Sequence, residues 1–201
     1  MSAEREEARR LPAGIHGIPP DVVARNQRER LVAAVAEACA DKGYADTSVA
    51  DLTTRAGVST ATFYKLFAGK HECALEAHRE LLERLLEEVD RAGGKVQGRV
   101  AKVRAAVRTV LVLFAADAPT ARLLTVEVLA LGPAGAARND AAVEAFASRL
   151  RRDPAGGSHA SASEWATVAG IAMLIGKRVM AGEATALPQL EDELVAMATA
   201  L

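Results

Sequence analysis

Apolar residues recur along most of this chain at intervals of three and four, which is the period of an amphipathic helix. Leu31, Val35 and Cys39 repeat every four residues and predict a helix that begins at Asp21 and ends near Gly43. No segment alternates apolar and polar residues for long enough to predict a strand, and no internal repeat is visible. The pattern therefore predicts an all-α protein.

Two short helices separated by a glycine are expected next. Ser48 is a candidate N-cap with Asp51 at the third helical position, which is the spacing of a capping box, and Gly57 is expected to end this helix in the left-handed conformation. Ser59 then caps the second short helix, and Lys70 opens a longer one. Two short helices joined by a tight glycine turn are typical of a helix-turn-helix.

The second short helix has two different faces. Phe63 and Phe67 share the side that we expect to be buried, whereas Ala61, Tyr64 and Lys65 share the other. An α-helix fits the major groove of B-DNA, and small residues at its start allow close approach to the duplex. Amide groups at the two helix starts, near residues 47–48 and 59–60, can also hold phosphate oxygens. Taken singly, an exposed Tyr or Lys is usually solvated surface, so the prediction depends on the combination.

Pro and Gly residues divide the rest of the chain into further predicted helices. Their approximate ranges are 70–92, 98–117, 120–131, 139–152, 161–181 and 188–201. The helix over 161–181 is apolar nearly all round from Trp165 to Ile175, so we expect it to be buried on both sides. Residues 1–20 mix charges with Pro and Gly and predict a flexible N-terminal arm.

Composition narrows the class of protein. Half of the 201 residues are apolar and the net charge is −1, so a nucleic-acid surface would have to be local. Cys39 and Cys73 occupy apolar helical positions and are expected to be buried thiols, as in a reducing cytoplasm. No apolar run approaches the ~20 residues of a membrane helix. We therefore expect a soluble cytoplasmic protein.

Neither catalysis nor metal binding is indicated. The sequence has no nucleophile elbow, phosphate loop or HExxH motif. His71 and Cys73 are two residues apart on a helix, so their side chains point in different directions and do not make a metal site together. We expect no enzyme, no cofactor and no metal.

A longer stretch carries a family resemblance. The run RNQRERLVAAVAEACADKGYADTSVADLTTRAGVSTATFYKLFAGKHECAL, from Arg25 to Leu75, resembles the DNA-binding domain of the TetR-type (TetR/AcrR) transcriptional regulators. It contains the order GY–TS–V–DL–AGVS–T–FY–F–K that marks this bacterial family. The resemblance implies about nine helices, a homodimer, a palindromic operator and a small-molecule effector, and it favours repression over activation. The implied division is an arm over 1–20, a helix-turn-helix domain over 21–72, and a helical effector-binding and dimerisation domain over 73–201.

The resemblance also implies DNA contacts residue by residue. Base contacts correspond to Thr60, Ala61 and Tyr64. Phosphate contacts correspond to Thr47 or Ser48, Thr62, Lys65 and Lys70. Ser59 is added as a DNA contact because it lies at the start of the second short helix. Where many members have Tyr-His or Tyr-Tyr, this chain has Lys65-Leu66 after Tyr64. Leu66 cannot hydrogen-bond to phosphate as a His would, so it is left out of the contacts.

An effector pocket is expected between helices of the C-terminal part. The candidates are Phe114, Leu124, Glu127, Val128, Phe146, Trp165 and Met173. Core packing is the alternative for each of them. Glu127 is the most distinctive, because a carboxylate within an apolar helix must pair, reach solvent or bind a polar ligand group. An apolar effector is the default expectation.

Three alternatives stay open. The helices over about 161–181 and 188–201 resemble the pair that joins two subunits in relatives, but Ala-rich helices of this kind also form monomer cores. The chain could be a helical interaction protein that has lost specific DNA binding. It could also be a transcriptional activator on the same fold.

Overall fold

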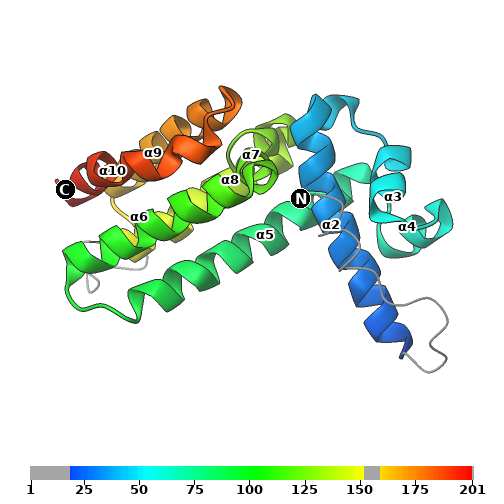
Figure 1. The fold of residues 1–201 in the computed structure, drawn as a ribbon, viewed down its shortest axis with the longest axis horizontal. Helices are drawn as coiled ribbons and strands as arrows, with labels where there is room; N and C mark the ends of the chain where they lie inside the picture. The colour runs from blue at the N-terminus through cyan, green and yellow to red at the C-terminus, as the bar shows by residue number, and fades with distance from the viewer. Residues whose placement is uncertain (1–18, 152–158, 201) are drawn as a thin grey trace. The chain divides into compact units, whose positions relative to one another are not determined.

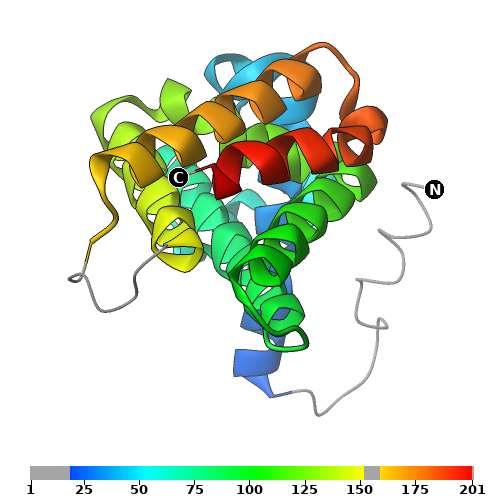
Figure 2. The same cartoon turned by 90° about the vertical axis from the view of Figure 1, so that its left-hand side faces the viewer.

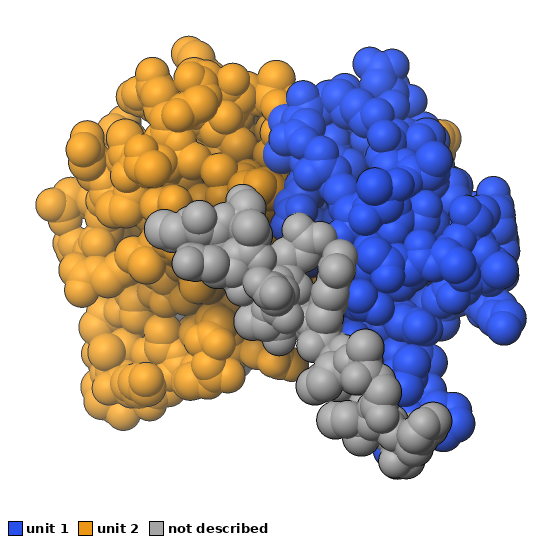
Figure 3. All heavy atoms as spheres, turned by 45° about the vertical axis from the view of Figure 1, so that its right-hand side comes forward, with its two compact units in different colours: residues 1–77 blue, residues 78–201 orange. Residues whose placement is uncertain are grey.

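A computed structural model describes residues 19–151 and 159–200, so the predicted arm lies almost entirely outside the described residues. Within these ranges the chain forms nine α-helices, α2 to α10, two 3-10 helices and no strand, which confirms the all-α prediction (Figure 1). The chain divides into two compact units, Met1–Ala77 and His78–Leu201 (Figure 3). The division follows Ala77, within a helix, rather than residue 72.

The first unit contains α2 (Pro20–Asp46), α3 (Val49–Ala56), α4 (Thr60–Leu66) and the start of α5 (Lys70–Gly93). The regular helical backbone of α2 breaks at Gly43, where φ is 80°, a left-handed value that glycine adopts at little cost. Its predicted apolar stripe is buried, and α2 packs against α3, which in turn packs against α4 (Figure 1).

The second unit begins with the rest of α5. The elements that follow are α6 (Arg99–Ala116), α7 (Ala118–Thr125), η1 (Glu127–Leu131), α8 (Gly132–Leu150), α9 (Ala162–Met180), η2 (Ala184–Leu190) and α10 (Glu191–Thr199). Helix α6 packs against η2 and α10, and α9 packs against α7, α8 and α10. Helices α9 and α10 run side by side (Figure 2).

Helix α8 begins earlier than the sequence pattern predicts, at Gly132 instead of about residue 139. The pattern treats Pro133 as a break between two helices, but it occupies the first turn of α8, where a missing N–H leaves no hydrogen bond unmade. Gly135 then allows a close approach, because a Cβ atom there would lie only 1.9 Å from the carbonyl oxygen of Val128. The turn between η1 and α8 therefore depends on a residue without a side chain.

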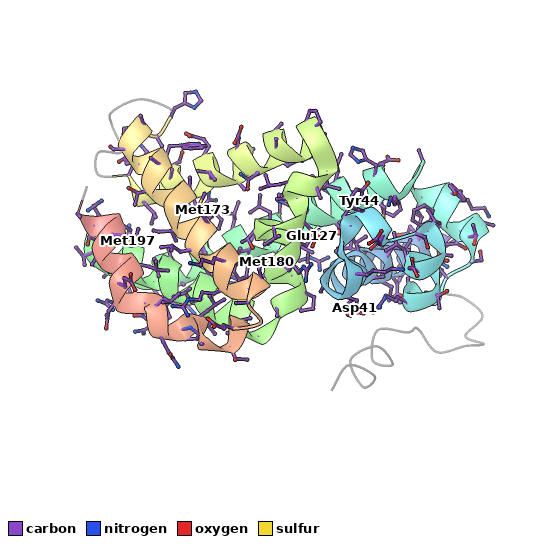
Figure 4. All side chains as sticks on the ribbon, turned by 90° about the horizontal axis from the view of Figure 1, so that it is seen from above. Asp41, Tyr44, Glu127, Met173, Met180 and Met197 are labelled. Carbon is purple, nitrogen blue, oxygen red and sulfur yellow. The ribbon has the colours of Figure 1, made fainter. Side chains whose placement is uncertain are left out.

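Helix α9 has one buried face and one exposed face in this single chain. Val168, Ile171 and Ile175 are in the core, whereas Met173 is 76% exposed and Met180 is 54% exposed. Figure 4 shows these two methionines on the same helix. The prediction that this helix is buried on both sides is therefore wrong for the isolated chain. For all its apolar character, neither α9 nor any other described helix is long and apolar enough to cross a membrane.

Candidate nucleic-acid interface and apolar cavity

Side-chain caps set the geometry of the α3–α4 helix-turn-helix. The Ser48 hydroxyl accepts a hydrogen bond from the Asp51 amide at 3.2 Å, and the Asp51 carboxylate accepts one from the Ser48 amide at 2.7 Å. This reciprocal pair confirms the capping box. Gly57 adopts φ 60° and ψ 40° and ends α3 as predicted. The Ser59 hydroxyl then accepts the Thr62 amide at 3.0 Å and starts α4. These local bonds define where each short helix begins.

The neighbouring aromatic residues of α4 point to opposite sides. Phe63 is fully buried, and its ring centroid lies 5.8 Å from that of Phe67 in the core of the unit. Tyr64 is 57% exposed, and its ring meets Phe63 edge to face with centroids 5.3 Å apart. Phe63 thus anchors the helix and Tyr64 is presented to solvent, as the sequence pattern predicts.

The exposed face of α4 combines small, hydroxyl and basic side chains. Thr60, Ala61 and Lys65 are exposed beside Tyr64. The Thr62 hydroxyl is hydrogen-bonded to the Ser59 hydroxyl at 2.9 Å. A face of this chemistry can enter a major groove, where hydroxyls meet base edges or phosphates and an ammonium meets phosphate.

Two predicted phosphate contacts have internal partners instead. Thr47 is buried, and its hydroxyl donates to the Gly43 carbonyl at 2.7 Å. The Lys70 ammonium donates to three carbonyl oxygens, of Tyr44 at 3.1 Å, Ala45 at 3.0 Å and Thr47 at 2.7 Å. The break at Gly43 leaves these carbonyls without helical partners, and Lys70 satisfies them. The prediction that these two side chains reach DNA does not agree with this geometry.

Most other charges near α3 are paired. The Lys42 ammonium donates to Asp51 at 2.6 Å and, as the largest cause, holds the pKa of that carboxyl well below its usual range. Arg55 pairs with Asp41. Lys65 forms no ion pair within the described part of the chain, so its charge is available to an external anion.

The second unit contains a partly open apolar cavity of about 100 Å³ among α5, α6, α7, α8, α9 and α10. Three of the predicted ligand residues line it: Phe114, Leu124 and Phe146. Polar side chains are few in the wall, and Asn139 and Arg149 are among them. Nowhere in the described ranges do three or more His, Cys, Asp or Glu side chains gather as metal ligands would.

The other four predicted ligand residues lie outside this wall. Glu127 is buried and pairs with Arg122, whose Nε lies 2.8 Å from Oε1 of the carboxylate. Val128 is fully buried in the core. Trp165 and Met173 are exposed on α9. Val128 therefore belongs to the core, and Trp165 and Met173 belong to an external surface. The carboxylate of Glu127 has an internal partner.

The sequence interpretation missed Asn139 and Arg149. A signal was available, because the wall residues of α8 follow one helical stripe: Asn139, Ala142, Val143, Phe146, Arg149 and Leu150. A polar residue at a position of an apolar stripe lies beside the interior. Apolar size, on which most of the candidates rest, does not separate cavity walls from core.

Comparison with known proteins finds a matching sequence segment in the first unit and solved structures with the same architecture. Residues 31–77 match the family model of bacterial regulatory proteins of the tetR family. The comparison with curated proteins found no significant match. The fatty acid degradation regulator FadR from Bacillus halodurans superposes with a TM-score of 0.73 at 15% identity, covering 86% of this chain and 98% of that one.

Two further solved structures are similar. FadR from Bacillus subtilis, in complex with stearoyl-CoA, has a TM-score of 0.71 at 14% identity and covers 86% of this chain and 98% of its own. A transcriptional regulator from Rhodococcus sp. RHA1 has a TM-score of 0.62 at 23% identity, covering 85% and 94%. At identities this low, the structural similarity establishes the fold alone. Residues 31–77 are therefore similar in sequence to the helix-turn-helix of tetR family regulatory proteins, and the chain as a whole shares the fold of these solved regulators.

Proposed function

We propose that this regulator binds a palindromic DNA operator as a homodimer, through the exposed face of α4. The observation that carries the proposal is the division of the aromatic pair, with Phe63 fully buried and Tyr64 57% exposed. Burial of Phe63 fixes the orientation of a short helix that would otherwise be marginal in water. Thr60, Ala61 and Tyr64 are then the residues proposed to meet bases.

Phosphate contacts are assigned to a smaller set than the sequence resemblance implies. Lys65 is proposed to meet phosphate through its free ammonium, and Ser48, Ser59 and Thr62 through hydroxyls or nearby amides at the helix starts. Thr47 and Lys70 are excluded, because their polar groups are hydrogen-bonded internally.

The proposed dimer interface is the exposed face of α9. Trp165, Met173 and Met180 recur along one side of the helix, and Leu174 lies next to them. An apolar stripe of this length is unusual on a monomer and is typical of a protein–protein contact. In the neighbouring α10, Leu194 is buried in the core. Of these two helices, α9 therefore has most of the exposed apolar surface.

The effector is proposed to be a small molecule with an apolar body that occupies the cavity of the second unit. A ligand of this kind changes DNA affinity if it binds one arrangement of the dimer better than another. Two recognition helices reach successive major-groove faces when they are about 34–36 Å apart, or a multiple of that distance. We assign the protein as a repressor whose DNA affinity the effector lowers.

Gel-shift titration on fragments selected from genomic DNA tests the DNA-binding face. If Lys65 neutralises one phosphate, Lys65→Ala should lower the magnitude of the slope of log affinity against log salt by about 1. Lys102→Ala, at an exposed lysine of α6, is the matched control and should leave the slope unchanged. Tyr64→Ala should weaken binding to the selected site more than to random DNA.

Two results would support the competing functions. Salt-insensitive binding, together with no effect of Tyr64→Ala, would favour a helical interaction protein without specific DNA binding. Increased transcription from the selected site in the presence of the protein would favour an activator.

Sedimentation analysis tests the interface independently of DNA. Met173→Glu should shift the protein from dimer to monomer, because it introduces a charge into the proposed apolar contact. Val112→Glu is the matched control, since Val112 is an exposed apolar residue on α6. If both variants stay dimeric, or if the wild type is a monomer, the α9 interface is wrong.

A further inference from the structure

The mostly apolar wall of the cavity in the second unit contains one charged residue. Arg149 lines the cavity, and 32% of its side chain is exposed to solvent. Arg149 therefore reaches from the cavity wall to solvent. Its guanidinium is the one cationic group among the wall residues of the described chain.

That guanidinium is held by a carboxylate in a geometry that a ligand can copy. The Nε and Nη2 atoms of Arg149 donate to the two oxygens of Asp90 at 2.8 and 2.9 Å, while Nη1 donates to the Ala145 carbonyl at 2.8 Å. A planar carboxylate accepts two parallel hydrogen bonds from a guanidinium. Any free carboxylate therefore offers the same two bonds that Asp90 makes.

The existing pair is exposed enough to exchange. The side chain of Asp90 is 57% exposed, and ion pairs at the surface contribute little to stability because water competes for both partners. A ligand carboxylate that replaces Asp90 keeps the two hydrogen bonds, and its apolar body adds burial in the cavity. The exchange therefore has a driving force beyond the ion pair itself.

We propose that the effector is a small carboxylate, whose apolar body fills the cavity while its carboxylate displaces Asp90 from Arg149. This inference rests on the proposed effector role of the cavity. The cavity volume of about 100 Å³ limits the body, since a cavity of about 150 Å³ holds one benzene molecule. A body of about four or five carbon atoms is therefore the size expected for this conformation.

The displacement also supplies a route for regulation. Asp90 belongs to α5, which begins at Lys70 in the first unit, whereas Arg149 belongs to α8. Release of Asp90 removes a link between α8 and the helix that enters the DNA-binding unit. The carboxylate of the effector thus acts on the same helix that the DNA-binding unit uses.

Calorimetric titration of the DNA-free, full-length protein with hexanoate and with its neutral analogue hexanamide tests the proposal at pH 7. The wild type should bind hexanoate at least tenfold more tightly than hexanamide. Arg149→Gln should reduce this preference to less than twofold, and Arg149→Lys should retain part of it. Asp90→Asn should tighten hexanoate binding several-fold without changing hexanamide binding, because the competing carboxylate is gone.

A purely structural role for the pair predicts a different result, in which both substitutions change the two affinities in parallel. Parallel changes of this kind would overturn the proposal. So would equal binding of hexanoate and hexanamide by the wild type, or no binding of either ligand. Thermal unfolding of each variant confirms that it is folded. A separate gel shift without ligand reports on DNA binding, so a failure of the proposed operator function is seen independently of the ligand result.

Discussion

A buried histidine in α5 predicts how the stability of this protein depends on pH. His78 is fully buried, and neither of its ring nitrogens has a hydrogen-bond partner in the described chain. Burial, and then the positive charge of Arg138, lower the pKa of His78 from 6.5 to about 4. The side chain is therefore a neutral imidazole at physiological pH, and its charged form is disfavoured in the fold.

The sign of the effect follows from the direction of the pKa change. The unfolded chain binds the proton more tightly than the folded chain does, so stability is complete above pH 6.5 and is lost as the pH falls toward 4. At about 1.36 kcal/mol per pH unit, the full loss is about 3 kcal/mol. Between pH 7 and pH 5 the expected loss is about 2 kcal/mol.

Urea unfolding at pH 7, 6 and 5, at fixed ionic strength and protein concentration, measures this loss. His78→Leu should remove most of it and should leave stability at pH 7 equal or higher, because two unpaired buried nitrogens are replaced by apolar atoms. His159→Leu is the control, since His159 is highly exposed, and it should keep the wild-type pH dependence. Carboxylates with lowered pKa values, such as Asp90, lose their stabilising contribution only at lower pH, so this window isolates the histidine. An unchanged slope in His78→Leu would refute the reasoning.

Three further predictions use the same unfolding assay or the gel shift. Gly135→Ala should destabilise by about 1–3 kcal/mol because the new Cβ meets backbone atoms, whereas Gly176→Ala should be neutral or stabilising, since its Cβ makes only ordinary contacts of 3.5 Å. Lys70→Met should cost about 1–3 kcal/mol by removing the donor to three carbonyls; a loss of DNA affinity with no loss of stability would contradict the internal role. Replacing Glu83 and Arg84, both exposed in α5, by two glycines should weaken the effect of the effector on DNA affinity, while effector and DNA each still bind alone. An unchanged effect would show that α5 does not couple effector binding to DNA binding.

The helix-turn-helix could be predicted because its determinants are local. Ser48 and Asp51 are three residues apart and bond to each other, and Gly57 needs only its own backbone freedom. The sides of α4 follow from helical geometry alone, so the sequence places Phe63 and Tyr64 on the correct faces. Predictions of this kind need no knowledge of what lies elsewhere in the fold.

The internal role of Lys70 could not be predicted for the opposite reason. Its three carbonyl partners lie 23 to 26 residues earlier in the chain, at the break that Gly43 makes in α2. Lys70 opens the helix that follows α4, and the sequence around it is compatible with either partner, a phosphate or a carbonyl oxygen. Only the tertiary fold distinguishes these partners.

The cavity wall depends on packing between helices, which periodicity does not contain. Phe114, Leu124 and Phe146 reach the cavity, but Val128 is equally apolar and fills the core. Met173 is apolar and faces solvent. Periodicity identifies which side of a helix is apolar, and the neighbours of that side decide whether it forms core, cavity or interface.

Helix α5 brings these features into one element. It carries Lys70 near the helix-turn-helix, buried His78 as the first residue of the second unit, and Asp90, which pairs with the cavity-wall residue Arg149. Lys70 and Asp90 are separated by 20 residues of continuous helix, a length of about 30 Å. No loop therefore interrupts the helix between these two residues. The buried, neutral His78 lies between them at a position where the fold tolerates little charge. Opening this position to water would remove the burial that lowers the pKa of His78, so the pKa would rise toward 6.5.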